Sequence, residues 1–259
     1  MDNINIVNLE DTSFAMKLLT SDRAEKMIEN GKLYFSCSKK WSTINKVGQG
    51  DKLEGVFAKI NIENKEVLKL YKLHYGETLD IEYDENYMYL RNKNLCYLPS
   101  YCFYSLKNKF WNINGDPYNA VSGTTDISKE ICRDFSNKKS SIVIIKDQAV
   151  FINQIIKQFE KKGISKEKVI IEYIKYKDLE GQYYKMDNNE CELFVKNKCF
   201  SYQREVRILI NSQSLKFKDY DEGFSIYIGN MSSYAELLEG YFPEGLRLES
   251  EIELVEIKD

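Results

Sequence analysis

One stretch near the carboxyl end, Phe200–Ile210, carries polar and apolar side chains in alternation. In a β-strand, alternate residues share a face, so one face is apolar and the other carries Gln203, Glu205 and Arg207. Burying such a polar row costs free energy unless its members are paired or used. One interpretation is a polar row that lines a cleft. If the protein is an enzyme, Glu205 would act as a base or ribose anchor and Arg207 would pair with phosphate or a carboxylate, with Tyr202 and Gln203 as candidate ligand contacts. The other interpretation is an exposed polar face of a sheet.

A glycine-rich segment, Gly48–Gly55, supplies two more carboxylates. Glycine permits close backbone approach, and Asp51 and Glu54 can hold a ribose hydroxyl, hold a metal or act as a general base. The segment lacks the spacings G-x-G-x-x-G and G-K-[ST] of phosphate-binding loops. Asp51 and Glu54 are candidate catalytic residues and Gly50 a candidate ligand contact. A turn between strands with solvated acids is the alternative.

Ser36 and Trp41 follow a predicted helix–strand unit, and their hydroxyl and indole can line a pocket or form a surface turn. Cys102 has no neighbouring cation in sequence to lower its pKa, which favours a packed thiol over a nucleophile. The six cysteines form no C-x-x-C pair, and His74 is the single histidine. We therefore expect reduced thiols, no metal site and no histidine-dependent triad.

Helix and strand signals are distributed along the whole chain. A helix over Arg23–Glu29 should end at Gly31, and a strand, helix and strand should follow one another from Ile142 to Tyr176 as a parallel unit. Shorter helices are predicted after Thr125 or Asp126, bearing Ile127, Ile131 and Phe135, and over Ser232–Glu239. Further predicted strands are Ile4–Leu9, Lys32–Ser36, Leu79–Tyr83, Tyr87–Arg91, Cys96–Leu106, Glu205–Ile210, Ser225–Ile228 and Glu251–Ile257. Loops are predicted around Gly115–Pro117 and Ser122-Gly123.

This pattern predicts one α+β domain over residues 1–259, with a mixed β-sheet and flanking helices. The net charge of −3 comes from 37 basic and 40 acidic residues that are interleaved, which argues against strong binding of duplex nucleic acid. No apolar run is long enough to span a bilayer, and the first residues have no secretory pattern. We expect a soluble, cytoplasmic protein without membrane contact.

Taken in order, several segments resemble a family of uncharacterised bacterial and phage proteins. They are Asn30–Ser36, Gly50-Asp51-x-x-Glu54-Gly55, Tyr101–Ser105, Phe194–Lys196 and Tyr202-Gln203-x-Glu205-Val206-Arg207. The family opens with a helix–Gly–strand unit and carries a late Q-x-E-x-R strand. Its layout is similar to that of ADP-ribosyltransferases, in which a glutamate on a late strand orients the nicotinamide ribose of NAD. The resemblance puts Glu205 at that position, although Lys32–Ser36 contains no arginine or histidine and a Ser-Thr-Ser strand motif is absent.

Two functional hypotheses follow. The first is a phage- or mobile-element-encoded protein of host–virus conflict that binds a host or defence-system macromolecule, with no cofactor and a tyrosine-rich protein interface. The alternative is an enzyme that uses NAD or another nucleotide through Glu205. An enzyme requires Glu205 and Arg207 to face a concave site that an acid of the Asp51/Glu54 loop shares. A binding protein requires the same residues to pair over a packed surface with no cavity.

Overall fold

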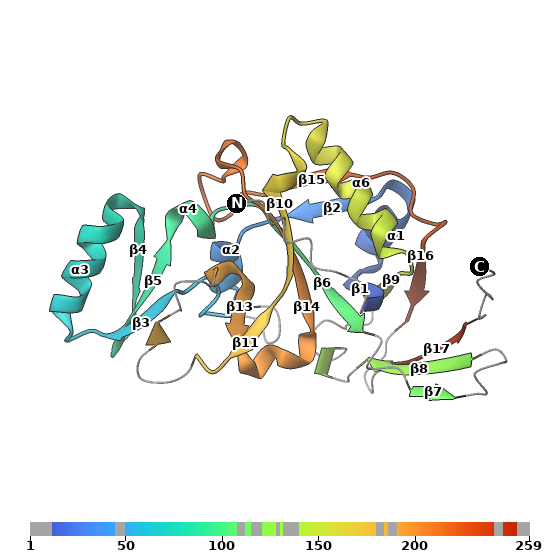
Figure 1. Ribbon diagram of the computed structural model, residues 1–259, viewed down its shortest axis with the longest axis horizontal. Helices are drawn as coiled ribbons and strands as arrows, with labels where there is room; N and C mark the ends of the chain where they lie inside the picture. Colours follow the sequence, from blue (N-terminus) through green and yellow to red (C-terminus); the bar gives the residue numbers. More distant parts are fainter. Residues whose placement is uncertain are drawn as a thin grey trace, which may run out of the picture.

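A six-stranded antiparallel sheet forms the centre of the protein (Figure 1), in the order β10-β14-β6-β1-β9-β16. The structure is a computed structural model that describes residues 12–44, 50–107, 112–114, 121–127, 130–131, 140–179, 184–185, 191–240 and 246–252. The strands are β1 (Thr12–Thr20), β6 (Ser100–Lys107), β9 (Ser140–Ile145), β10 (Val169–Tyr173), β14 (Glu205–Ile210) and β16 (Ala235–Glu239). Helices pack against this sheet, which confirms the α+β class.

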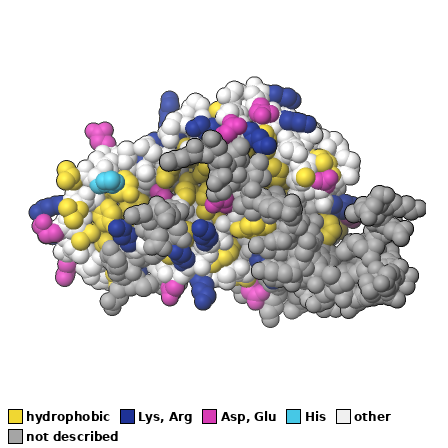
Figure 2. Space-filling model, in the orientation of Figure 1, with side chains coloured by type: hydrophobic (Ala, Val, Ile, Leu, Met, Phe, Trp, Pro, Cys, Tyr) yellow, Lys and Arg dark blue, Asp and Glu magenta, His cyan; other side chains and the backbone are white. Residues whose placement is uncertain are grey.

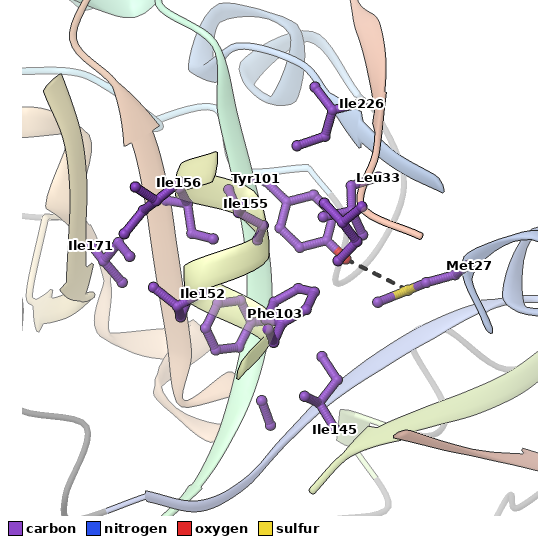
Figure 3. Close-up of a cluster of buried hydrophobic side chains, with 14 of the residues drawn as sticks. Met27, Leu33, Tyr101, Phe103, Ile145, Ile152, Ile155, Ile156, Ile171 and Ile226 are labelled. Carbon is purple, nitrogen blue, oxygen red and sulfur yellow. Dashed lines mark hydrogen bonds between the residues drawn. The ribbon is translucent and has the colours of Figure 1, made fainter. Parts of the chain in front are cut away.

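The helices α1 (Ser21–Asn30) and α6 (Gln148–Glu160) contribute to one apolar core with the sheet. Figure 3 shows Ile152, Ile155 and Ile156 of α6 close to Tyr101 and Phe103 of β6. Helix α6 begins where predicted, because the side chain of Asp147 accepts a hydrogen bond from the backbone N–H of Val150 at 2.9 Å.

The predicted strand–helix–strand unit is present, with its two strands in one sheet. Strands β9 and β10 flank α6 in sequence and have three strands between them in the sheet. Because every neighbouring pair in this sheet is antiparallel, β9 and β10 run in the same direction. The two strands that α6 connects are therefore parallel to each other, but each is hydrogen-bonded only to antiparallel neighbours within the main sheet.

The chain leaves α1 through Gly31, which adopts the left-handed conformation with φ of 61° and donates its N–H to the carbonyl of Met27. Strand β2 (Lys32–Phe35) follows as predicted and pairs with β15 (Phe224–Tyr227). The short helix α2 (Ser38–Thr43) comes next. This helix–glycine–strand unit lies against the main sheet, where Ser36 forms an isolated bridge to Ser100 of β6.

A second sheet, in the order β12-β3-β5-β4, lies beside the first with helix α3 against it (Figure 1, left). The predicted hairpin of β4 and β5 is present. Helix α3 was not anticipated, and its apolar side chains are only partly buried in the cluster that includes Phe57 and Leu90. The elements here are β3 (Ala58–Asn61), α3 (Lys65–Tyr75), η2 (Gly76–Thr78), β4 (Leu79–Tyr83), β5 (Tyr87–Asn92), α4 (Lys93–Cys96) and β12 (Tyr184–Lys185).

Short elements complete the described fold. Strands β11 (Lys175–Lys177) and β13 (Val195–Asn197) form a parallel pair, and β7 (Asn112–Asn114), β8 (Val121–Ile127) and β17 (Leu246–Ile252) form a three-stranded sheet. The 3-10 helices besides η2 in the described ranges are η4 (Lys166–Lys168), η5 (Glu192–Phe194), η6 (Lys198–Gln203) and η7 (Gln213–Leu215). Within the described part of the chain, no helix is long and apolar enough to cross a membrane.

Several predicted elements are wrong. Ala235–Glu239, expected to be helical, is the edge strand β16, because pairing with β9 outweighs the helix preference of Ala, Glu and Leu. Thr125, Asp126 and the expected Ser122-Gly123 loop all belong to strand β8. The single strand predicted over Cys96–Leu106 is split by Pro99, with Cys96 ending α4 and β6 beginning at Ser100.

Other expectations fall on residues outside the described ranges. They are the strand Ile4–Leu9, the loop Gly115–Pro117, Phe135, Gly48, the end of the last strand beyond Ile252, and Cys132. The five described cysteines are free thiols.

Gly31 supports a test of the α1–β2 connection. A Cβ added at Gly31 would lie 2.4 Å from the carbonyl oxygen of Gly229, whereas a Cβ at Gly163, also in the left-handed region, would meet nothing within 4 Å. We expect Gly163→Ala to lower the free energy of unfolding by about 1–2 kcal/mol through backbone strain alone. Gly31→Ala should lower the free energy of unfolding clearly more, because the backbone of Gly229 must also move. Urea unfolding measures both, and equal losses would contradict the steric argument.

Candidate functional site

The polar row of β14 faces away from the main core, as its alternation predicts. Val206, Ile208 and Ile210 lie in the large apolar cluster, and Glu205 and Arg207 project from the opposite side of the strand. Both charged side chains are nevertheless buried. A buried charge requires partners, so the contacts of these two residues define the site.

The guanidinium of Arg207 makes contacts in four directions. It donates to Glu54 Oε1 at 2.5 Å and to Glu205 Oε1 at 2.7 Å, and also to the backbone carbonyl of Leu193. Its Cζ lies 4.8 Å from the ring centroid of Trp41, within the range of a cation–π contact. Arg207 therefore joins β14 to the glycine-rich segment, to η5 and to α2.

Lys196 of β13 approaches Glu205 from the other side. Its Nζ donates to Glu205 Oε2 at 3.1 Å and to Gln203 Oε1 at 2.8 Å. Between those two acceptors lies Arg204, which has φ of 47° and is the one non-glycine with positive φ among the described residues. The chain reverses its curvature at this left-handed residue, between the end of η6 and the start of β14. Gln203 and Glu205 therefore both reach Lys196. Such strained backbone is often found at functional sites.

A second buried arginine fixes the segment that presents Glu54. Arg91 of β5 donates to the backbone carbonyls of Glu54 at 2.9 Å and Lys52 at 2.5 Å. The Asp51 carboxylate accepts from the backbone N–H of Leu53 at 2.9 Å, as in a side-chain-closed turn. These bonds hold the Glu54 carboxylate against Arg207.

A cavity of about 600 Å³ lies beside this ion-pair network. Strand β1 pairs with β6 from Thr12 to Met16, whereas its pairing with β9 continues to Thr20. Strands β1 and β6 therefore separate beyond Met16, and residues on both sides of the separation line the cavity. The described lining residues on these two strands are Lys17 and Leu19 of β1, and Ser100, Tyr101, Cys102 and Tyr104 of β6.

The cavity has a charged floor and a basic mouth. Glu205, Arg207, Lys196, Gln203 and Glu54 are buried and form the floor. The mouth carries exposed side chains from α1 and β2 together with half-buried ones from α2. Among the described lining residues, basic side chains outnumber acidic ones by seven to three. The seven are Lys17, Arg23, Lys26, Lys32, Lys40, Lys196 and Arg207. Figure 2 shows charges of both signs interspersed on the visible surface.

The pKa values of the buried carboxylates shift in different directions. Burial alone would raise the pKa of Glu205, but the positive charges of Lys196 and Arg207 outweigh it and hold that pKa well below its usual value. Burial raises the pKa of Glu54, although Arg207 opposes this, and burial also raises the pKa of Asp51. Glu205 is thus a buried carboxylate that its cationic neighbours hold in the ionised form.

The structure brings together five of the eight residues selected from the sequence. Glu205, Arg207, Glu54, Gln203 and Ser36 all line the cavity.

The remaining three are not among its described lining residues. Asp51 lies behind the floor, within electrostatic reach of Lys196 and Arg207, and Tyr202 packs against the small apolar cluster on the same side of the sheet. Gly50 is needed for packing, since a Cβ there would be 1.6 Å from the carbonyl oxygen of Ile44.

Sequence reasoning missed Lys17 and the basic residues of the mouth. Lys17 occupies an apolar-looking run, Phe14–Leu19, and a lysine in the middle of a strand was the available signal. Arg23 and Lys26 lie three residues apart on α1 and Lys32 begins β2, but no local pattern indicates that these exposed cations border a cavity. Comparison of the chain with protein-family models, curated proteins and solved structures finds no match.

The ion-pair network predicts that removing a buried charge costs more free energy of unfolding than removing an exposed one. Glu205→Gln leaves Arg207 and Lys196 buried with one anion fewer, so the free energy of unfolding should fall by about 3–5 kcal/mol. Glu236→Gln is the matched control, because Glu236 pairs with Lys146 at 3.3 Å where both side chains are more than half exposed. That change should cost less than about 1 kcal/mol. Urea unfolding at pH 7 measures both, and a small loss for Glu205→Gln would contradict the network.

A comparison of wild type with Glu205→Gln at several pH values reveals the titration of Glu205. An unfolded glutamate has a pKa of about 4.3. Because the folded pKa is lower, Glu205 stabilises the native state fully above about pH 4–5 and loses that contribution as the pH falls. The stability difference between wild type and Glu205→Gln should therefore shrink on acidification. A difference that stays constant from pH 7 to pH 3 would exclude a depressed pKa.

Proposed function

We propose that the chain is an enzyme that binds a nucleotide in this cavity and acts at its ribose. The observation that carries the proposal is the ionised, buried carboxylate of Glu205 at the floor of a cavity whose mouth is basic. A nucleotide has the matching arrangement, with anionic phosphates at one end and a neutral, hydroxyl-bearing sugar further in.

The mouth suits a phosphate group. Arg23, Lys26 and Lys32 are exposed and line the cavity from α1 and β2. Lys26 pairs with Asp22 at 2.7 Å, but both side chains are largely exposed, so a phosphate can compete for the ammonium group at small cost. Several cations around one opening also attract anionic ligands over longer range.

The walls suit a base and a sugar. Tyr34, Trp41 and Tyr101 line the cavity, each with a cation over its ring, and a nucleobase can stack on a ring face that the cation leaves free. The hydroxyl of Ser36 is buried at the cavity and has no hydrogen-bond partner among the described residues. Buried hydroxyls are normally satisfied, so a polar group of a bound ligand is a fitting partner for Ser36.

Glu205 has room for one strong donor. Its two oxygens offer about four acceptor positions, of which Arg207 and Lys196 fill three with hydrogen bonds. The Cys102 thiol donates a further hydrogen bond to this carboxylate and contributes to its low pKa. A thiol is a weak donor, so a ribose hydroxyl can replace it.

Glu205 would stabilise charge that develops on the sugar. When the bond between C1′ and the base nitrogen breaks, the electron pair leaves with the base and positive charge builds on C1′ and the ring oxygen. A fixed carboxylate in a dry site stabilises that charge, and its hydrogen bond to the sugar hydroxyl strengthens at the same time. Water or an acceptor hydroxyl then adds to C1′ and releases a proton. NAD, with nicotinamide as the leaving base, is one substrate of this class.

The cavity favours this proposal over the first of the two sequence hypotheses. If Glu205 and Arg207 had only a structural role, they would pair with each other over a packed surface without a cavity. They do pair, but a cavity lies beside them. Binding of a host or defence-system macromolecule stays a prediction. It is supported by the exposed Leu70 and Leu73 of α3, which are 67% and 86% accessible.

The phosphate-binding role of the mouth can be tested directly. Arg23→Ala/Lys32→Ala should weaken binding of ADP-ribose at least about tenfold, because each charge-assisted hydrogen bond is worth roughly 1.5–3 kcal/mol. With NAD as substrate, KM should rise and kcat should stay nearly constant. The control is Lys161→Ala/Lys162→Ala, which removes two exposed charges after α6. Calorimetry supplies the affinities, and equal binding by both double variants would refute the assignment.

The role of Glu205 is tested by release of nicotinamide from NAD, followed by chromatography. Glu205→Gln should lower kcat by at least about 10²-fold, the usual cost of losing one charge-stabilising group. Circular dichroism confirms folding, since this variant is also less stable. Ser36→Ala touches no ion pair and should reduce the affinity for ADP-ribose without loss of stability. Wild-type protein that neither binds ADP-ribose nor releases nicotinamide would overturn the proposed function.

A further inference from the structure

Lys17 occupies an unusual position for a lysine. It lies on β1, an internal strand of the main sheet with β6 on one side and β9 on the other. Its neighbours on the same face of the strand, Ala15 and Leu19, contact the apolar core. Lys17 is the first residue beyond the point where β1 and β6 stop pairing, so its side chain enters the cavity at the separation of the two strands.

The surroundings of the amine are defined by β6. Lys17 Nζ donates to the backbone carbonyl of Cys102 and lies 4.7 Å from the ring centroid of Tyr101. Ser100 exchanges backbone hydrogen bonds with Ser36, so by alternation the carbonyl of Cys102 points to the same edge of β6. The amine thus satisfies a carbonyl that the separated strand β1 leaves open, and it is held at one place in the cavity wall.

Burial and neighbouring charges determine how readily the Lys17 amine loses its proton. Burial lowers the pKa of Lys17, with Lys196 of β13 acting in the same direction and Cys102 and Glu205 opposing. Glu205 is the carboxylate in this set, and it is already bonded to Arg207 and Lys196. Two other carboxylates line the cavity, and they pair with Lys26 (Asp22) and Arg207 (Glu54). The Tyr101 ring lies within cation–π distance of the amine and favours its charged form, against the effect of burial. Neutral amines are nucleophiles, and desolvated lysines serve in this way in enzymes.

We propose that Lys17 is a nucleophilic amine that captures the carbonyl carbon of a small anionic aldehyde or ketone in the cavity. The basic mouth holds the anionic group while the carbonyl reaches Lys17. The nitrogen lone pair attacks the carbonyl carbon, a proton moves from nitrogen to oxygen to give a carbinolamine, and loss of one water yields an imine. No oxidant or reductant is needed.

This chemistry is separate from the proposed ribose chemistry, although both use one cavity. A sugar phosphate in its open-chain form is an anionic aldehyde, so a ribose released from its base belongs to the same ligand class. The reactivity of Lys17 does not require that Glu205 cleave a glycosidic bond. It can therefore be tested with a probe that is not a nucleotide.

The probe is pyridoxal 5′-phosphate, an anionic aldehyde, followed by borohydride to reduce the imine to a stable amine. At limiting probe, peptide mapping of the native protein should find the pyridoxyl group on Lys17 in large excess over exposed lysines. Labelling of Lys17 should persist at lower pH than labelling of exposed lysines, because its amine loses its proton at lower pH. ADP-ribose should compete if the nucleotide occupies the same cavity. Labelling of Lys17 without competition would count against the proposed function and leave this inference standing.

The variants separate reactivity from folding. Lys17→Arg keeps a cation that can bond the Cys102 carbonyl but is no nucleophile, so the specific label should disappear. Lys59→Arg is the matched control, since Lys59 is a buried strand lysine that also lies near an aromatic ring, 4.3 Å from the centroid of Tyr87, and is not among the described residues of the cavity lining. This variant should keep the label. The inference is overturned if the native wild type is labelled mainly on exposed lysines, an outcome that decides the matter even where Lys17→Arg does not fold.

Discussion

The guanidinium of Arg207 is a full charge withdrawn from water, and much of the surrounding structure serves to compensate it. Glu54, Glu205, the Leu193 carbonyl and the Trp41 ring converge on it from separate elements. With Lys196 added, the floor holds two cations and two carboxylates, so its charges balance. The positive excess of the cavity therefore arises from the mouth, where Arg23, Lys26, Lys32 and Lys40 lie, and this excess is what a ligand meets. Removing one member of the floor unbalances the others, which couples stability to chemistry at this site.

The cavity exists because a sheet is interrupted. Continuous pairing of β1 and β6 would close the space, and separation leaves backbone groups that must find other partners. Two backbone groups of β6 have such replacement partners. Ser100 pairs with Ser36, and the carbonyl of Cys102 accepts a hydrogen bond from Lys17. The side chains that line the opening thus replace part of the missing ladder. A ligand that enters meets groups already oriented by the sheet, which lowers the entropic cost of binding.

Local patterns in the sequence were sufficient for the parts of the fold that local forces decide. The two-residue period placed Glu205 and Arg207 on one face of β14, and the glycine signal placed the end of α1 at Gly31. Long-range pairing decided the rest. The segment Ala235–Glu239 has good helix formers and becomes a strand because β9 offers an open edge. Lys17 was missed for the same reason, because its role depends on where β1 and β6 part, a property of two strands distant in sequence.

The order of the strands has a consequence for the assembly of the protein. Strand β14 is inserted between β10 and β6, and the Glu54–Arg207 ion pair joins residues 153 positions apart. A chain emerging from the ribosome has made β1, β6, β9 and β10 before Arg207 is synthesised. Contacts of such long range are slow to form, because a large loop must close before they contribute. The buried carboxylate of Glu54 has no cationic partner from β14 until that closure. The charged floor is therefore completed late in folding, and a chain truncated before β14 lacks its Glu205 and Arg207.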